Sequence, residues 1–154
     1  MDTSKEYIQM CGEATEIQSE HLPQSGDYGV RSCEYPNYPA GLISWNWDSG
    51  RSKLRWLLLD GSDGITLEHP YSFLERIIWL PRQDQLQEIL MRDMPPYAGD
   101  AFGAWVAWSM PNLDIACKNR LVAITTMEQL WLTHVMKEKY GKNWNGTDWV
   151  KSNE

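Results

Sequence analysis

Residues 42–60 constrain the fold of this chain more than any other segment. Ile43, Trp45 and Trp47 alternate with polar residues, which is the period of a half-buried β-strand. The turn-forming run Asp48–Arg51 follows, and an apolar stretch comes directly after it. Two strand patterns joined by such a turn predict a β-hairpin. The chain must therefore fold around at least one antiparallel strand pair.

Helical patterns flank this hairpin on both sides. Thr3 and Glu6 have the spacing of a capping box, and one apolar face follows them at helical spacing. Pro81 suits the first turn of a second helix, and Gly141 suits the left-handed C-cap of a third. The patterns predict helices at 3–19, 82–91 and 126–140, with short strands around 28–34 and 65–67.

These elements predict a single α+β domain over residues 1–154, in which a small antiparallel sheet packs with three to four helices. A chain of 154 residues has a common single-domain length, and it shows no linker and no internal repeat. Residues 101–124 fit a short helix or a strand equally well. The helix at 126–140 has a wide apolar face that must be buried for stability. We expect Trp144 and Trp149 to flank a turn and pack on the domain; the alternative is a frayed tail whose indoles await a partner.

Composition and charge narrow the function classes. The net charge is −7 and no basic patch is visible, so we expect no binding to nucleic acid. No apolar run is long enough for a membrane span, and the N-terminus does not resemble a signal peptide. The three cysteines lack paired spacing, which favours reduced thiols and a cytoplasmic protein.

The sequence contains no motif that specifies a catalytic, metal or cofactor site. The run Asp60–Gly64 resembles part of a calcium loop but lacks the downstream acidic ligand, which favours a turn. His134 lies on the apolar face of the last helix, as a core or boundary residue would, and the His residues lack partners at ligand spacing. We expect no catalytic residue, no metal and no cofactor.

Two segments are candidates for binding. The first is the start of the second helix, where free N–H groups attract anions and Arg82 would add positive charge. The alternative is a polar outer helix face with Trp79 in the core. The second segment is the tryptophan pair near the C-terminus. The candidate binding residues are Trp79, Arg82, Gln83, Gln85, Trp144 and Trp149.

Three stretches resemble a family of small uncharacterised proteins encoded by phages and prophages of Gram-positive bacteria. They are Glu6–Gln18, Trp79–Leu90 and Met127–Lys142 with the two following Trp residues, and they cover about a third of the chain. The resemblance implies expression inside a bacterial host. It implies no particular reaction.

The preferred interpretation is therefore a non-enzymatic accessory or protein-binding module of phage or prophage origin, with a host or phage protein as partner. One alternative is a small enzyme whose site assembles only in the fold, using Glu88, Arg82 or His134. Another is an acidic inhibitor of a host nuclease that uses the acidic face of the first helix. The sequence does not identify the partner, any ligand or the oligomeric state.

Overall fold

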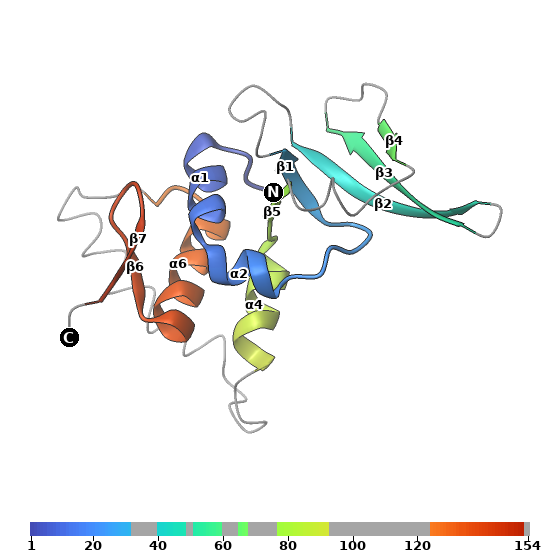
Figure 1. Cartoon of the computed structure of the whole chain (residues 1–154). Coiled ribbons are helices and arrows are strands. Elements are labelled where there is room, and N and C mark those ends of the chain that lie inside the picture. The colour runs from blue at the N-terminus through green and yellow to red at the C-terminus, as the bar shows by residue number, and fades with distance from the viewer. Residues whose placement is uncertain (32–39, 49–50, 60–64, 68–76, 93–123, 153–154) are drawn as a thin grey trace. The chain divides into compact units, whose positions relative to one another are not determined.

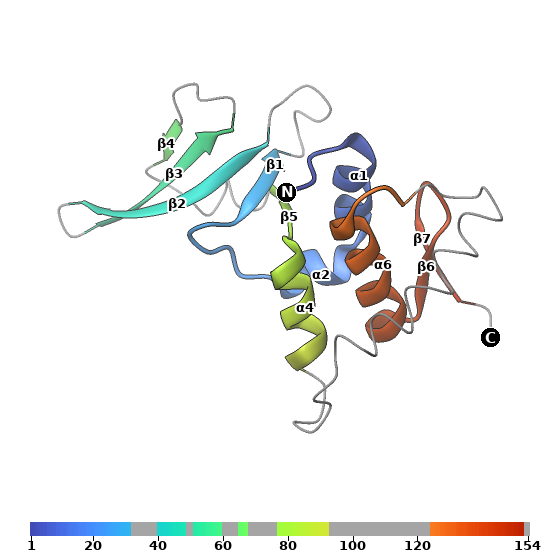
Figure 2. The same ribbon diagram turned by 180° about the vertical axis from the view of Figure 1, so that it is seen from behind.

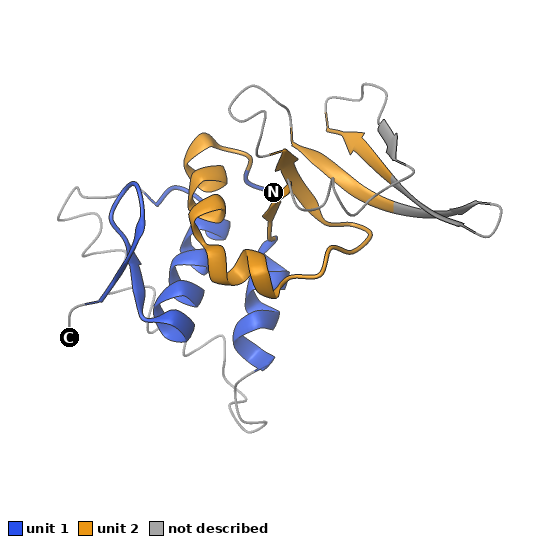
Figure 3. Cartoon of the chain, viewed as in Figure 1, with its two compact units in different colours: residues 1–2, 82–154 blue, residues 3–81 orange. Residues whose placement is uncertain are grey.

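The computed structural model describes residues 1–31, 40–48, 51–59, 65–67, 77–92 and 124–152 (Figure 1). The chain divides into two compact units (Figure 3). Unit 2 is Thr3–Pro81, and unit 1 combines Met1–Asp2 with Arg82–Glu154. An antiparallel sheet and several helices are present, so the predicted α+β class is confirmed. The prediction that all 154 residues form one domain stays a prediction.

Unit 2 contains a five-stranded sheet of order β4-β3-β2-β1-β5 in which the neighbouring strands are antiparallel. The hairpin predicted within 42–60 is confirmed as β2 and β3, and the strand at 65–67 as β4. The strand predicted at 28–34 is present as β1, and its residues 32–34 lie outside the described part. The strands are β1 (Tyr28–Arg31), β2 (Gly41–Asp48), β3 (Arg51–Leu58), β4 (Ile65–Leu67) and β5 (Ile77–Leu80).

The buried indole of Trp56 shapes the middle of this sheet. A Cβ placed on Gly41 would collide with that indole, and a Cβ on Gly29 would collide with the side chain of Ile77. Trp56 is fully buried, so its ring has no room to move away from a new methyl group. Gly41 therefore allows the indole on β3 to lie close to the backbone of β2, and Gly29 on β1 leaves room for the side chain of Ile77 on β5.

The predicted helix at 3–19 is wrong in one respect, because it is two helices. Helix α1 spans Lys5–Glu13 and α2 spans Thr15–Glu20, with a break at Ala14 (φ −81°, ψ 62°). The N-cap is Ser4, whose hydroxyl accepts the N–H of Tyr7 at 3.2 Å, so the predicted Thr3 capping box is also wrong. The predicted apolar face is confirmed, since its residues are buried: Tyr7, Met10, Cys11, Ala14 and Ile17.

The break between α1 and α2 has a polar cause at Gln18. Its side-chain N–H₂ donates to the carbonyl of Cys11 at 3.0 Å and to the carbonyl of Trp79 at 2.9 Å. Its side-chain oxygen accepts the backbone N–H of Trp79 at 2.8 Å. Strand β5 is an edge strand, so this amide takes the position of a further strand at Trp79. A straight helix would give up these long-range bonds.

Unit 1 contains α4 (Gln83–Arg92), α6 (Met127–Tyr140) and a hairpin of β6 (Lys142–Trp144) and β7 (Trp149–Lys151). Figures 1 and 2 show α4 beside α6, and the hairpin follows the end of α6. The predicted helices at 82–91 and 126–140 are confirmed. Thr126 is the N-cap of α6, and Gly141 is its left-handed C-cap (φ 63°).

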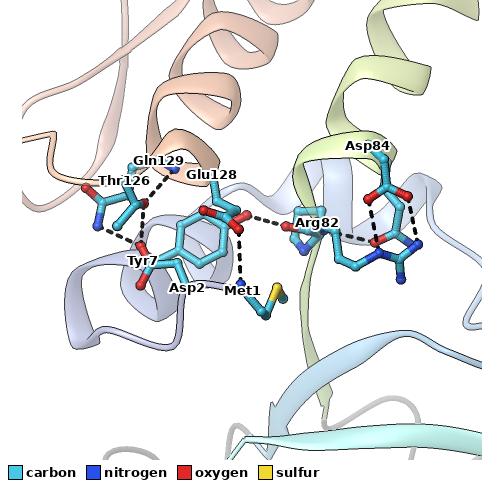
Figure 4. A network of polar contacts seen from close by, with 10 residues as sticks. Met1, Asp2, Tyr7, Arg82, Asp84, Thr126, Glu128 and Gln129 are labelled. Atoms are coloured by element: carbon cyan, nitrogen blue, oxygen red, sulfur yellow. Dashed lines mark hydrogen bonds and ion pairs between the residues drawn. The ribbon is translucent and has the colours of Figure 1, made fainter.

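The first two residues of the chain bind the start of α6 (Figure 4). The buried carboxylate of Asp2 accepts the hydroxyl of Thr126 at 2.7 Å and the side-chain N–H₂ of Gln129 at 2.9 Å. The amino group of Met1 forms an ion pair of 3.4 Å with Glu128. A negative charge at a helix N-terminus also interacts favourably with the helix dipole. Residues 124 or more positions apart are thus joined within unit 1.

Several sequence-based predictions fall on residues outside the described part. These are the ambiguous stretch up to residue 123, the turn at 60–64, and the side chains of Cys33, His69 and Cys117. Cys11 is described; it is buried and is not part of a disulfide. In the described part of the chain, no helix combines the length and the apolar character that crossing a bilayer requires.

Candidate functional site

The loop between α2 and β1, residues 21–27, is closed at its base by two side chains. His21 Nε2 lies 2.7 Å from Asp27 Oδ2. Asp27 is almost fully buried, with 2% of its surface exposed, and His21 is largely buried. A buried carboxylate is costly unless it is hydrogen-bonded, so this pair defines where the two ends of the loop must meet.

The backbone of the loop is held by the same carboxylate. Asp27 Oδ2 also accepts the N–H of Gln24 at 2.6 Å, and the N–H of Asp27 returns to the carbonyl of Gln24 at 3.2 Å. Gly26 has φ 97°, which an L side chain rarely adopts, and its N–H binds the carbonyl of Ile43 on β2. The loop is therefore an ordered extension of the sheet.

Stacking on Trp79 fixes the histidine itself. The imidazole of His21 and the indole of Trp79 have centroids 3.4 Å apart, and their planes differ by 3°. Trp79 is 6% exposed, which agrees with the alternative that placed it in the core. Its backbone is bound by Gln18, so β5, α2 and the loop are joined at this residue. Trp79 therefore supports the loop, and its role in binding stays a prediction.

Leu22 stands at the exposed end of this ordered loop. Its side chain is 79% exposed, the largest value among the described large apolar residues that face solvent. Gln24 and Ser25 beside it are exposed as well. A single exposed leucine is common, but here it follows directly on a histidine held by a buried acid and a buried tryptophan. The hydrogen bonds of Asp27 and Gly26 hold the backbone of the loop that carries this apolar side chain.

The residues predicted at the start of α4 are involved in local contacts. The guanidinium of Arg82 binds both carboxylate oxygens of Asp84 at 3.0 Å, and this contact lowers the pKa of Asp84. The side chain of Gln85 accepts the N–H of Arg82 at 2.9 Å, which caps the helix, and Gln83 is half-buried. An anion would compete with Asp84 for Arg82, and binding at this helix start stays a prediction.

The two C-terminal tryptophans face each other across β6 and β7. Trp144 and Trp149 are cross-strand partners, with ring centroids 5.1 Å apart. Trp149 is buried and Trp144 is half-buried. The N–H of Ser152 returns to the carbonyl of Gly141 at 2.8 Å, so the segment is folded back on itself. The prediction that it belongs to the fold is confirmed, and the frayed-tail alternative is wrong.

The residues of the enzyme alternative occupy different environments on α4 and α6. Glu88 is exposed and lies 3.8 Å from Arg92. His134 is buried as expected, and burial lowers its pKa from 6.5. No group of three His, Cys, Asp or Glu side chains suited to a metal ion occurs in the ranges that the structure describes.

Sequence reasoning missed the pairing of His21 with Asp27. The two residues are six positions apart, across a loop that contains Pro23 and Gly26, and no regular period joins them. The usable signal was the run Gln24-Ser25-Gly26-Asp27, whose Ser, Gly and Asp residues are typical of a turn. It predicts a turn, but it does not predict the histidine or the stacked indole.

Comparison with protein-family models, with curated proteins and with solved structures gave no match to this chain. The candidate site therefore rests on its own geometry.

Proposed function

We propose that this chain is a non-enzymatic protein-binding module that presents Leu22 to its partner. The observation that carries the proposal is the ordered loop 21–27, in which a leucine is 79% exposed beside a clamp of largely buried side chains. An apolar anchor held in advance loses little conformational freedom on binding, so more of its burial appears as affinity. Compact loops with closed ends are frequently functional for this reason.

The resemblance to proteins of phages and prophages supports the same proposal. It implies expression inside a bacterial host, where a phage accessory protein would act by binding a host or phage protein. The negative charge of −7 favours a protein partner over nucleic acid, because phosphates would be repelled.

Site-specific photo-crosslinking tests the proposal. A photoreactive amino acid replaces Leu22 in one variant and Leu59 in the control, because both leucines are exposed and belong to unit 2. Irradiation in a Gram-positive host should give one dominant cross-linked protein from position 22 and none of it from position 59. Equal labelling from both positions, or none from position 22, would contradict a binding role for the loop.

One observation favours a second function, a small enzyme with His21 as general base. A buried aspartate hydrogen-bonded to a histidine orients the imidazole, as acid–base catalysis requires. Such an enzyme would lose turnover in His21→Asn while retaining it in Leu22→Ala. A binding module would instead lose its partner in Leu22→Ala, so the two variants separate the functions.

A further inference from the structure

The stretch of chain that carries the loop has an unusual charge pattern. Residues 6–30 contain five carboxylates and no Lys or Arg. The 14 Lys and Arg residues of the 154-residue chain would place about two in a stretch of this length. Lys5 and Arg31 lie just outside it. Between Lys5 at the start of α1 and Arg31 at the end of β1, all side chains with a fixed charge are thus negative.

The structure separates these five carboxylates by role. Asp27 is buried and is used in the clamp. The other four lie on α1 and α2, where Glu6, Glu13 and Glu20 are exposed and Glu16 is half-exposed. Glu16 and Glu20 are four residues apart on α2 and so share a face, and Glu20 precedes Leu22 by two positions. The exposed leucine therefore has acidic neighbours along the chain and no nearby Lys or Arg.

We infer, on the basis of the proposed function, that the partner is a protein with a basic surface around an apolar pocket that receives Leu22. Charge complementarity at the rim of an interface guides association and excludes partners of like charge. It disfavours a second copy of this chain at the same surface, because both copies would bring the same carboxylates together. It also disfavours nucleic acid and anionic lipid, which are negative themselves.

Two double variants that change the net charge by the same amount test this inference. Glu13→Gln/Glu20→Gln neutralises one exposed carboxylate on α1 and one on α2, and Glu88→Gln/Glu138→Gln neutralises one on α4 and one on α6. The protein that cross-links at position 22 is purified. Its affinity for each variant of the full chain is measured by calorimetry at about 0.05 M and 0.5 M NaCl. The distance over which charges interact shortens severalfold between these two salt concentrations. Heparin serves as a defined competing polyanion.

Binding of the parent chain should weaken at high salt and be inhibited by heparin. Glu13→Gln/Glu20→Gln should weaken it about tenfold at low salt, and Glu88→Gln/Glu138→Gln should change it less than about twofold. Equal losses of affinity in both double variants would show that binding depends only on the net charge of the chain, which overturns the inference. A partner that binds through Leu22 but is unaffected by salt and heparin would also overturn it while the proposed function stands. Absence of a cross-linked protein at position 22 would overturn both.

Discussion

Two buried aspartates tie the chain together in different ways in the two units. Asp27 in unit 2 joins residues only three and six positions away, and it thereby shapes one loop. Asp2 in unit 1 joins the first residues to the start of α6, 124 and 127 positions later. A buried carboxylate thus orders a single loop in unit 2, whereas in unit 1 it joins two segments that are far apart in the sequence. We therefore expect loss of Asp2 to affect the stability of the molecule more than loss of Asp27.

The largest expected effect is that of Asp2→Ala. It removes the carboxylate that accepts from the buried amide of Gln129 and from the half-buried hydroxyl of Thr126, which costs about 1–3 kcal/mol for each group. A total loss of about 3 kcal/mol corresponds to a fall of about 6–12 °C in the thermal midpoint for a chain of this size.

Differential scanning calorimetry measures this change, with Asp148→Ala as the control because Asp148 is exposed in the turn between β6 and β7. A single transition in the parent protein would support the predicted single domain, and two transitions would contradict it. An unchanged midpoint in Asp2→Ala would show that the contact at α6 is dispensable.

A smaller and more local effect is expected for Asp27→Ala. The variant removes the acceptor of Gln24 N–H and the partner of His21, with an expected loss of about 2 kcal/mol. Hydrogen exchange should increase at Gln24 and Gly26, while amides of α6 keep their protection. Fluorescence of Trp79 should also change as the stacked imidazole is released. Loss of protection from hydrogen exchange in both units would show that the effect of Asp27 is not confined to its loop.

The third effect concerns pH and belongs to His134 in unit 1. Burial lowers the pKa of His134 in the folded state below its ordinary value of 6.5, while Glu138 nearby partly opposes this shift. The unfolded chain therefore binds a proton more readily, so the stabilising contribution is complete above pH 6.5 and is lost as the pH falls further.

Thermal midpoints measured from pH 7 to pH 5 should fall more steeply in the parent protein than in His134→Gln. The partners of Asp2, Thr126 and Gln129, do not titrate in this range, so His134 should account for the acid response at α6. Parallel curves for the two proteins would refute this assignment.

The smallest expected effect on stability is that of Leu22→Ala. The side chain is 79% exposed, so its removal should change the free energy of unfolding by less than about 0.5 kcal/mol. Binding to the partner should nevertheless be lost. Urea denaturation and calorimetry with the purified partner test the two statements separately. A clear loss of stability would mean that Leu22 packs in the fold, and the loop would then not be a contact surface.

Regular patterns made most of the fold predictable. The alternating segment around Trp45 and Trp47 predicts its hairpin correctly, and Gly141 ends the last helix as expected. Strand β5 was not predicted. Ile77, Ile78 and Trp79 favour a strand, but Pro81 indicates the start of a helix directly after them. The break at Ala14 was missed because its cause, Gln18 binding Trp79, joins residues 61 positions apart.

The candidate site was far less predictable than the fold. Trp79 was selected for binding, yet the structure buries it beneath His21, and the exposed residue that matters for the proposal is Leu22. Arg82 was expected to attract an anion, yet Asp84 two residues later already holds its guanidinium. Burial and pairing depend on which side chains meet in space, and residue type alone does not report them.

The sequence by itself determines the α+β class, the hairpin, three helical segments, the acidic stretch from 6 to 30 and the negative net charge. These properties follow from local periodicity and from composition, which need no knowledge of distant contacts. Only the tertiary structure decides that Asp2 binds α6, that Gln18 protects the edge of β5 and that Asp27 and Trp79 hold His21 below an exposed Leu22. Each of these contacts satisfies a buried polar group or an edge backbone group with a partner outside its own helix or strand, and that choice of partner is made by the packing of the folded chain.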